Sequence, residues 1–538
     1  MTRAAAVAAV LLCCGLSARA ATFTITDHGA VADGKSDSTA AIDRAVEAAG
    51  AAGGGVVRVP PGTFVTGGVE LRSDVTLQID KGATLLLDPN PARYRVIRTR
   101  WGGVDCYNFA GLIVAKDADR VAVIGEGTID GRGAAWWPWK KTEGFALRRL
   151  RELAGSTDDA KRRVFGLATD ALRPPLVLFA RCTNVTVDGV MLANSPMAGV
   201  HLLECDGAIV RNATIAAAGP DTDGVLIDSS SRVLVERCTF EVNGDAVALA
   251  AGFGPRARAA YRPTTDVAVR DCTVKLARAA LSIGPDSAAG VRNVTATGIR
   301  NTDPKHPDLK SDLRGLLRIT SDAVNSGDVS NLTLSELTLK DVAGPVIEIT
   351  CTDAPTAPGT RNTPHAGSGA ESDGPDSPVK TPRISDVQIS KLTCDGARDA
   401  IKVRGHAASP VTKLVLRDVE ITRSQTAASL RHVSHVTLDA LRLSPKSGPA
   451  LTLDRAAHIT VDHLRADALA KSTPLVSLKN AAHVTLQRLA PPKSTETLLQ
   501  LAGPQTNHIS LADTDAKSAK TIVEKKLDLP ADLVLTVE

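Results

Sequence analysis

The sequence predicts an all-β protein: a right-handed parallel β-helix closed at its N-terminal end by a helical cap. The first observation is a short strand-like run that recurs at intervals of 22 to 34 residues over most of the chain. Examples are CTNVTVDGVML at 182–192, SNLTLSELTL at 330–339 and AHVTLQRLAP at 482–491. Within each run apolar and polar residues alternate, as expected of half-buried strands. Most runs have a companion apolar run upstream, so each coil has two or three strands that stack on the next coil.

Composition agrees with a solenoid. The 538 residues are 43% hydrophobic but only 3% aromatic, which suits a core of stacked aliphatic side chains. This length would ordinarily indicate several domains, but a solenoid grows by repetition, so we expect one domain over residues 21–538. A hairpin propeller would require antiparallel turns and a repeat of about 40–50 residues, which the spacing does not match.

The first twenty residues are typical of a signal peptide. Arg3 precedes the apolar run AAAVAAVLLCCGLS, and Ala18-Arg19-Ala20 matches the small-x-small rule for cleavage. A lipid anchor on Cys13 or Cys14 is the alternative. No other stretch reaches the length of apolar residues that a membrane span needs. We therefore expect a secreted or periplasmic protein with no membrane span.

Three segments interrupt the repeat. Residues 23–64 contain a candidate cap at Asp37 or Ser38, then an Ala-rich amphipathic helix and a Gly stop, which predicts the helical cap. A cap is needed because an open end would expose strand edges. Residues 140–172 predict a charged helical insertion. Residues 353–382, rich in Pro, Gly and Ser, predict a flexible loop.

Charge and cysteine content exclude several classes. A net charge of +4 spread over the chain does not indicate a nucleic-acid-binding protein. Seven cysteines follow the signal peptide, an odd number too widely spaced for a disulfide framework. Stacked buried thiols are one interpretation and a single bridge is the other. We expect a monomer with no cofactor and no metal.

Four histidines immediately precede strands in the late coils, at intervals of 23, 25 and 25 residues: His435, His458, His483 and His508. Asn184, Asn293 and Asn331 occupy the comparable point in earlier coils. In register, these side chains would form a ladder at the strand spacing of about 4.8 Å. A structural turn ladder is one interpretation, and a metal ion shared by neighbouring imidazoles is the other. If the ladder is buried, protonation below about pH 6 should loosen these coils.

Over nearly its whole mature length the chain resembles glycoside hydrolase family 28, the polygalacturonase family. The order and spacing of several segments carry the resemblance: FTITDHGAVADGKSDSTAAI, GGGVVRVPPGTFVTGGVELRSDVTLQIDKGATLL, RWGGVDCYNFAGLIVAKDADRVAVIGEGTIDGRGAAWWPWKK, NSPMAGVHLLECDGAIVRN and GPDTDGVLIDSSSRVLVERCTFEVNGDAVALAAG. The resemblance implies a glycosidase that inverts configuration, using an Asn-Thr-Asp motif and a Gly-Asp-Asp motif one coil later. Such hydrolysis uses one carboxyl group as the acid and others to activate water.

One family carboxylate is missing. Laid on this chain without gaps, the first motif falls on 221–223 and the second on 243–245. Asp223 and Asp245 then hold the water, while the family's acid position is Gly244. A shift by one residue instead makes Asp245 the acid and Ala246 the lost base.

Further departures surround these motifs. The family's Gly-His-Gly corresponds to residues 278–280, where the site His is absent and Arg278 is a candidate substrate-binding residue or base. Its Arg-Ile-Lys corresponds to 318–320, so Arg318 remains and Lys becomes Thr320. The Lys after the Asp pair becomes Ala250. Losing Lys while keeping Arg argues against ordinary polygalacturonate as the substrate. His201 is a candidate cleft residue, because the family also has a His after its Asn-Ser-Pro segment.

Asp221 stands where the family has Asn. If Asp221 and Asp223 lie at i and i+2 on one strand, they face the same way and cluster with Asp245. Like-charge crowding raises at least one pKa, which a general acid requires. Asp221 is therefore a candidate relocated acid. The alternatives are an inactive surface patch and other carboxylates such as Asp228, Asp271 or Asp286.

Three functions remain open. The first is a secreted hydrolase of a pectin-related or other polysaccharide. The second is a carbohydrate-binding β-helix that has lost its general acid. The third is a polysaccharide lyase, which would require a denser acidic Ca²⁺ cluster than the sequence shows. The four tryptophans, Trp101, Trp136, Trp137 and Trp139, either stack on sugars or pack the insertion against the coils.

Overall fold

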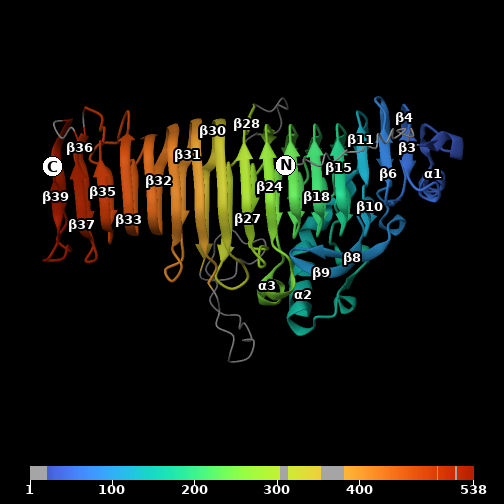
Figure 1. Ribbon diagram of the computed structural model, residues 1–538, viewed down its shortest axis with the longest axis horizontal. Coiled ribbons are helices and arrows are strands. Elements are labelled where there is room, and N and C mark those ends of the chain that lie inside the picture. The colour runs from blue at the N-terminus through green and yellow to red at the C-terminus, as the bar shows by residue number, and fades with distance from the viewer. Residues whose placement is uncertain (1–20, 303–312, 353–380, 494, 515–517) are drawn as a thin grey trace, which may run out of the picture.

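The computed structural model describes residues 21–302, 313–352, 381–493, 495–514 and 518–538. The chain winds into a long right-handed parallel β-helix, which confirms the predicted fold (Figure 1). Most coils contribute one strand to each of three parallel ladders, and the last coils contribute strands to only two of them. The predicted signal peptide and most of the predicted loop at 353–382 lie outside the described residues.

The first ladder carries the candidate site. Its strands pair in register from one coil to the next. In chain order they are β5 (Val69–Leu71), β10 (Ile113–Lys116), β14 (Val177–Ala180), β17 (Val200–Leu203), β20 (Val225–Asp228), β23 (Val247–Ala250), β26 (Leu281–Ile283), β29 (Leu317–Asp322), β34 (Pro474–Lys479), β36 (Thr495–Ala502) and β38 (Ala519–Lys525).

The other two ladders complete each coil. The second ladder contains β1 (Thr22–Thr24), β3 (Gly55–Val59), β6 (Val75–Ile79), β11 (Ala122–Gly125), β15 (Thr183–Asp188), β18 (Asp206–Arg211), β21 (Ser231–Glu236), β24 (Thr264–Arg270), β27 (Val291–Thr297), β35 (Ala482–Gln487), β37 (Asn507–Ala512) and β39 (Leu535–Val537). The third contains β2 (Asp33–Asp37), β4 (Gly62–Thr66), β7 (Ala83–Leu87), β12 (Thr128–Asp130), β16 (Met191–Ala193), β19 (Thr214–Ala217), β22 (Thr239–Val242), β25 (Thr273–Leu276) and β28 (Arg300–Asn301). Four long strands run through the corners and join several ladders: β30 (Val329–Thr352), β31 (Ile384–Arg404), β32 (Val411–Pro445) and β33 (Leu451–Arg465).

The core consists of aliphatic columns. In the second ladder Leu77, Val123, Val187, Val210 and Val235 pair in register over successive coils, and each is fully buried. Their alternate neighbours point outward, which is the period-2 pattern of the sequence. Because each column is completed only by the next coil, burial is shared along the rod rather than gathered at one centre.

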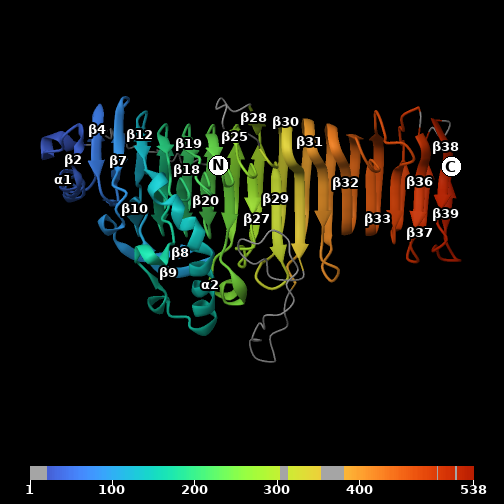
Figure 2. The ribbon, with the colours of Figure 1, turned by 180° about the vertical axis from the view of Figure 1, so that it is seen from behind.

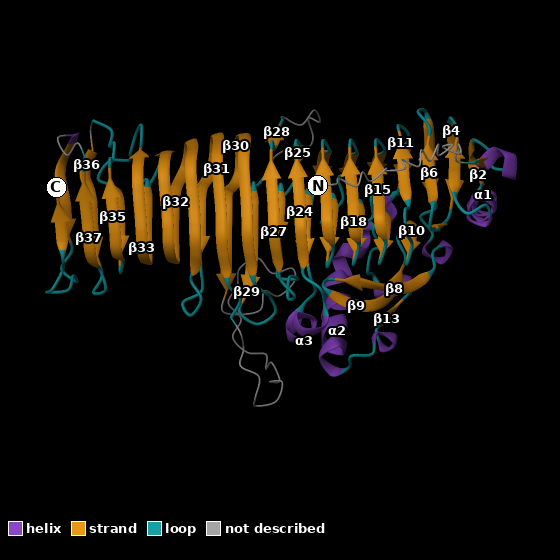
Figure 3. Cartoon of the chain, viewed as in Figure 1, coloured by secondary structure: helices purple, strands orange, loops and turns teal. Residues whose placement is uncertain are grey.

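The N-terminal end is capped as predicted. Helix α1 (Thr39–Ala51) lies at the end of the rod (Figures 1 and 3). The Asp37 carboxylate accepts the Thr39 N–H at 3.0 Å, whereas the Ser38 side chain makes no capping bond. The helix stops before a run of three glycines with positive φ, Gly53 to Gly55. Its apolar face, which includes Ile42 and Val46, closes the first coil against solvent.

A second structural unit lies along one long edge of the rod, over its N-terminal half (Figures 1 and 2). It contains the antiparallel pair β8 (Val96–Trp101) and β9 (Val104–Phe109), the short β13 (Val164–Phe165), and helices α2 (Lys140–Ser156) and α3 (Gly254–Ala260). We call this unit the cover. The helical insertion predicted at 140–172 is helical only to Ser156, because Gly155, Ser156 and Thr157 are poor helix formers. Beyond it, short 3₁₀ turns and β13 follow. The 3₁₀ turns after α2 lie at Ala160–Arg162 and Ala168–Asp170, and the others in the described residues lie at Ile25–His28, Pro91–Arg93, Gly133–Ala135 and Trp137–Trp139.

All seven cysteines of the described chain are buried, and none of them is joined to another of the seven in a disulfide. The interpretation as stacked thiols is therefore confirmed, and the single bridge is wrong for these residues. Within the same described ranges, no helix combines the length and apolar character needed to cross a bilayer.

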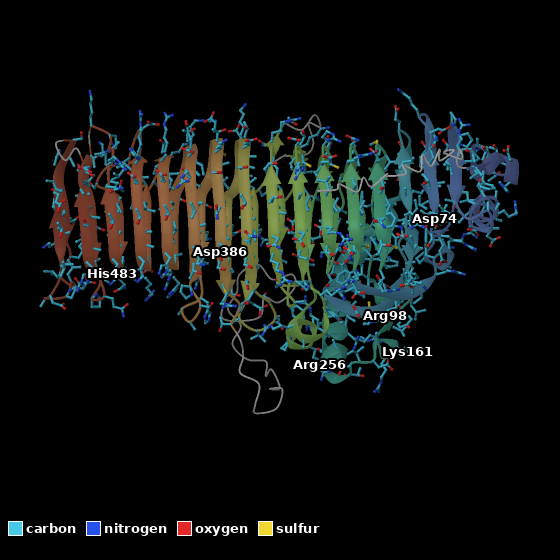
Figure 4. The ribbon with its side chains drawn as sticks, in the orientation of Figure 1. Asp74, Arg98, Lys161, Arg256, Asp386 and His483 are labelled. Atoms are coloured by element: carbon cyan, nitrogen blue, oxygen red, sulfur yellow. The ribbon has the colours of Figure 1, made fainter. Side chains whose placement is uncertain are left out.

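The histidine ladder forms as predicted. His435, His458, His483 and His508 stack with ring centroids 4.6 to 4.8 Å apart. Figure 4 labels His483 in the late coils, far along the rod from Arg98 and Arg256 in the cover. The four residues have left-handed φ between 54° and 56°, and their side chains are exposed. Since the ladder is exposed, the condition for pH-dependent loosening of these coils is not met.

Candidate functional site

A pocket of about 590 Å³ lies between the first ladder and the cover. Its floor is the outward face of five adjacent strands, β17, β20, β23, β26 and β29. In-register pairing places His201, Leu226, Ala248, Ser282 and Arg318 side by side in one row across that floor. Strands are about 4.8 Å apart, so the row gives a run of evenly spaced positions along which a sugar chain can lie.

Helix α2 forms one wall of the pocket. Lys140, Glu143, Leu147 and Arg151 line it, and their spacing of three or four residues places them on one face of the helix. The wall is fixed to the coils by ion pairs at both ends of this face.

At the first turn of α2, Glu143 accepts the Arg173 Nε–H at 2.6 Å, and both side chains are almost fully buried. Lys140 donates to Asp221 at 2.6 Å. Three turns later, Arg151 donates to Asp286 at 2.8 Å. Burial raises the pKa of Asp286 despite the opposing charge of Arg151. The wall is therefore held by charges whose partners lie on the coils.

The turn between β8 and β9 closes the space beside α2. Gly102 and Gly103 both have positive φ. A Cβ at Gly102 would lie 2.6 Å from Leu147, and one at Gly103 would lie 2.6 Å from Phe253. The Phe253 N–H donates to the Gly103 carbonyl at 2.9 Å. Only glycines let this turn pass so close between α2 and the loop before α3.

Arg278 and Ser282 hold the Asp245 carboxyl group in place in the pocket. Arg278 donates to both of its oxygens, Nε to Oδ1 at 2.9 Å and Nη2 to Oδ2 at 2.5 Å. The Ser282 hydroxyl donates to Oδ2 at 2.7 Å. Burial alone would lower the pKa of Arg278, but the charge of Asp245 raises it overall. A two-point guanidinium contact and a hydroxyl donor together stabilise the carboxylate.

Asp223 has the opposite character. Its Oδ1 accepts the Asp245 N–H at 2.7 Å, and Arg278 Nη2 approaches no closer than 4.0 Å. Burial, with the nearby charge of Asp245, raises the pKa of Asp223 to about 7, although Arg278 opposes this rise. Below pH 7 the pocket therefore contains a protonated Asp223 beside the Asp245 carboxyl group, which accepts hydrogen bonds from Arg278 and Ser282. Both lie within 4.0 Å of the same Arg278 nitrogen. Acid–base cleavage of a glycosidic bond uses two carboxyl groups in different surroundings, and here only Asp245 has close donors from Arg278 and Ser282.

Gly244 explains how Asp223 comes to lie there. A Cβ at position 244 would lie 2.2 Å from Asp223 Oδ1 and 2.7 Å from the Thr222 carbonyl. The backbone is fixed on both sides, with the Gly244 N–H donating to Thr222 and its carbonyl accepting from Arg278. An acid side chain at position 244 and the Asp223 carboxyl group in its present position would therefore occupy the same space.

Asp221 does not lie on a strand, so this part of the prediction is wrong. Strand β20 begins only at Val225, and Asp221 lies in a turn with left-handed φ of 47°. Burial alone would raise the pKa of Asp221, but the hydrogen bond from Lys140 and the charges of Lys140 and Arg278 lower it overall. The three aspartates do cluster, since Arg278 contacts all of them. The raised pKa, however, belongs to Asp223, so Asp221 does not have the property expected of a relocated acid.

A buried network lies at the β8–β9 end of the pocket. Arg100 donates to Asp105, Glu204 and Asp228 at 2.7 to 2.8 Å and stacks on the Tyr261 ring. Burial raises the pKa of Asp228, with Arg100 opposing. Sequence reasoning named Asp228 only among other carboxylates and missed Arg100 altogether. These partners lie up to 128 residues apart, so no local pattern signals the network.

His201 lines the pocket beside this network, as the sequence predicted for a cleft residue. Its side chain is 2% exposed, and neither ring nitrogen has a hydrogen-bond partner among the described residues. The nearest carboxylate oxygen, Asp228 Oδ2, is 3.9 Å from Nε2, which is too long for a hydrogen bond. Burial, with the charge of Arg100, lowers the pKa of His201 to about 3, so the ring is neutral at ordinary pH.

The other predicted binding residues also reach the pocket. Arg318 lies in its floor with Nε 3.3 Å from Glu348. Ala250 and Thr320, at the positions of the two lost lysines, also line the pocket. Arg278 is present, but its contacts are with aspartates. Substrate binding by Arg318, His201 and Arg278 stays a prediction.

The tryptophans mostly pack the insertion. Trp136 is buried and makes edge contacts with Tyr94, Phe109 and Trp139, with ring centroids 5.0 to 6.4 Å apart. Trp101 is the tryptophan that lines the pocket.

Comparison with known families gives two matches. Residues 168–438, half of the chain, match the model of glycosyl hydrolases family 28. Residues 22–87 match the model described as rhamnogalacturonase A/epimerase, pectate lyase-like.

Two curated relatives are similar over part of the chain. A probable polygalacturonase of Vitis vinifera is 27% identical over 296 residues, covering 53% of this chain and 55% of the relative. The exo-poly-alpha-D-galacturonosidase of Dickeya chrysanthemi is 27% identical, covering 51% of this chain and 49% of the relative. The chain thus spans about half the length of these relatives.

Among solved structures, an exopolygalacturonase from Thermotoga maritima superimposes with a TM-score of 0.60 at 26% identity. The superposition covers 76% of this chain and 90% of that one. A family 28 exopolygalacturonase from Yersinia enterocolitica gives a TM-score of 0.61 at 18% identity, covering 87% and 78%, which shows the shared fold.

Proposed function

The chain belongs to glycosyl hydrolases family 28, and from this we propose that it hydrolyses glycosidic bonds in a pectin-related polysaccharide. The observation that carries the proposal is the pair of unequal carboxyl groups in the pocket. Asp223 has its pKa raised to about 7, and Asp245 accepts hydrogen bonds from Arg278 and Ser282. The relatives named polygalacturonases support a pectin-related substrate.

In this proposal Asp223 donates the proton. Its Oδ1 is occupied by the Asp245 N–H, so Oδ2 is the oxygen that carries the proton to the departing glycosidic oxygen. Asp245 accepts a proton from the attacking water as the C–O bond breaks, and Arg278 fixes the orientation of that carboxylate. Asp221, neutralised by Lys140 and Arg278, stabilises Arg278 rather than transferring protons.

Family resemblance alone gives Asp223 the task of holding water, with the acid at the position of Gly244. The proposal reverses this, because no side chain fits at Gly244 while Asp223 keeps its position. A carbohydrate-binding protein without turnover is the second candidate, and the same missing side chain favours it. The two candidates differ in a single measurable quantity, the release of new reducing ends.

The test is reducing-sugar release from pectin-related polysaccharides by the chain starting at Ala21, with Asp223→Asn as the critical variant. Removal of the proton donor is expected to lower the rate by about a thousandfold. Asp266→Asn is the matched control, because Asp266 is exposed, has left-handed φ and occupies the turn position held by asparagines in other coils. Release that is equal in Asp223→Asn and wild type would overturn the proposed role. No release by wild type on any substrate would favour the binding protein.

The pH profile gives a second check. A general acid works only when protonated, so kcat/KM should fall as pH rises through about 7, the pKa of Asp223. The raised pKa also contributes stability that is present below about pH 4 and is lost as pH rises toward 7. An activity profile that stays flat from pH 6 to pH 9 would contradict Asp223 as the acid.

A further inference from the structure

We propose that the pocket accepts an uncharged glycosyl unit, not a uronate, beside the Asp223–Asp245 pair. The inference rests on the proposed function and adds the class of sugar to it. It rests on two observations. Every cation in the described lining of the pocket is already paired with a carboxylate, and one buried polar side chain has no hydrogen-bond partner among the described residues.

Each cation in the described lining of the pocket already binds a carboxylate of this chain. The six lining cations and their partners are Arg100 with Asp105, Glu204 and Asp228; Lys140 with Asp221 and Glu143; Arg151 with Asp286; Arg173 with Glu143; Arg278 with Asp245 and Asp221; and Arg318 with Glu348. A uronate is bound most strongly by a guanidinium or ammonium group whose N–H donors can turn to the sugar carboxylate. Four of these cations also fix the catalytic aspartates or the α2 wall, so turning them to a ligand would dismantle the site.

Arg318 is the most accessible of the five lining arginines, and it marks the strongest case for uronate binding, because Lys140, similarly exposed, is held between Asp221 and Glu143. The Arg318 side chain is 38% exposed, and the partner Glu348 is 25% exposed. If a uronate paired with Arg318, Glu348 would lose its partner. Glu348 would then lie beside the carboxylate of the sugar, because Arg318 and Glu348 are in-register neighbours on β29 and β30. Like charges at that spacing repel, so the gain from Arg318 would be offset. Lys402, the next residue in the row, is exposed and lies outside the lining of the pocket.

The two positions at which the family has a lysine have an uncharged residue in this chain. Ala250 and Thr320 both line the pocket, and neither side chain is charged. Meanwhile three lining carboxyl groups, Asp223, Asp228 and Asp286, have raised pKa values chiefly because they are buried. A pocket in which burial already disfavours carboxylates would disfavour a carboxylate on the ligand for the same reason.

His201 points to what is bound instead. It is fully buried, neutral, and lines the pocket with both ring nitrogens lacking a protein partner among the described residues. A neutral imidazole has one donor and one acceptor nitrogen, and a sugar hydroxyl can both donate and accept. Asp228 Oδ2 lies 3.9 Å from His201 Nε2, so one hydroxyl placed between them can bond to both.

The test compares two ligands that differ only at C6. Short oligomers of α-1,4-linked galacturonate are one probe, and the same oligomers with each carboxylate reduced to a primary alcohol are the other. Binding is measured by calorimetry on Asp223→Asn, which cannot turn the ligand over. We expect the reduced oligomers to bind about tenfold more tightly, the cost of an unpaired buried charge. Equal or tighter binding of the galacturonate oligomers would overturn the inference, as would failure of both probes to bind.

Two variants change the preference in a predicted direction. Glu348→Gln removes the partner of Arg318, and Thr320→Lys adds an unpaired ammonium group to the pocket floor. Each should strengthen galacturonate binding severalfold and leave binding of the reduced oligomers unchanged. Glu336→Gln is the matched control for Glu348→Gln, because Glu336 forms an exposed pair with Lys391 outside this pocket. If neither pocket variant alters galacturonate binding, ion pairing is not what excludes uronates, and the inference fails.

His201→Leu tests the hydroxyl contact. Leu178 and Leu226 are its in-register neighbours, so leucine suits the row. The variant should weaken binding of the reduced oligomers about tenfold; an unchanged affinity would remove His201 from the argument. These binding results are independent of turnover. A wild-type chain that binds the reduced oligomers but releases no reducing sugar would disprove the hydrolase and leave the uncharged subsite standing.

Discussion

The coils under the cover and the coils beyond it have the same strand repeat, but their ion pairs are buried in the first region and exposed in the second. Under the cover, Arg100 and Arg173 are each 1% exposed and bind carboxylates that are also buried. In the late coils Arg442 bonds to Glu420 with both side chains at least 40% exposed. The repeat itself therefore does not make a site.

The difference lies in what covers the outward face. Where α2 and the β8–β9 turn enclose the first ladder, desolvation and the charge of Asp245 raise the pKa of Asp223 to about 7, although its side chain is 20% exposed. On the uncovered coils Asp462 bonds to Arg488 at the surface, and this contact lowers the pKa of Asp462. The pKa of a carboxyl group on this solenoid is thus set by its surroundings, which are the enclosing protein, the neighbouring Asp245 and the distance of the nearest arginine, and not by its position in the repeat.

Among the changes that test this comparison, the largest effect is expected from filling the space at Gly244. Gly244→Asp restores the family's side chain, yet its Cβ would lie 2.2 Å from Asp223 Oδ1. We expect activity to fall by about a hundredfold or more, because Asp223 must move. Reducing-sugar release measures this directly, on protein whose melting temperature is checked in parallel.

Gly144→Asp is the matched control for Gly244→Asp. Gly144 lies on the exposed side of α2 with no atom within 4 Å of a built Cβ. Its substitution should leave turnover unchanged. Activity in Gly244→Asp equal to or above that of wild type would show that the backbone admits an acid there, and would return Asp223 to the water-holding role.

A smaller effect is expected from the charges that fix the cover. Glu143→Gln keeps the shape of the side chain but leaves Arg173 buried without its carboxylate. Breaking a buried pair at one partner should lower the free energy of unfolding by about 3 kcal/mol. Urea denaturation measures the loss, and Glu336→Gln in the exposed coils should leave the midpoint unchanged. If both variants behave alike, burial by the cover is not what distinguishes the two regions.

Most of the fold could be predicted from the sequence because it depends on short-range patterns of residues. Alternation within each strand and a recurrent turn position repeat in every coil, so each copy confirms the others. The turn position holds Asn184, Asn293 and Asn331 early and the four histidines late, all with φ near 55°. The helical cap at α1 has its own local signals, the Asp37 carboxylate and the glycine stop.

The site could be predicted only in part. Asp223 and Asp245 lie one coil apart in sequence, so the motif spacing located both. Which of them carries a raised pKa depends on Arg278 and on the space beside Gly244, and neither is visible in spacing. Arg100 binds Asp228 across 128 residues, and such a pair has no periodic signal. The mistaken strand at Asp221 has the same origin, because its left-handed turn is fixed by contacts with Lys140 and Arg278 from other segments.

The smallest effect is expected on the uncovered coils, at the histidine ladder. His483→Asn removes a ring that stacks on His458 and His508 at 4.6 to 4.8 Å. Asparagine tolerates left-handed φ better than most residues and holds the same turn position in earlier coils, where Asn331 donates to Asn293. The lost stacking and the gained backbone preference should nearly cancel, so we expect the free energy of unfolding to change by less than about 0.5 kcal/mol. A loss as large as that of Glu143→Gln would show that the exposed ladder stabilises the rod as strongly as a buried ion pair. Charge burial would then no longer separate the two regions.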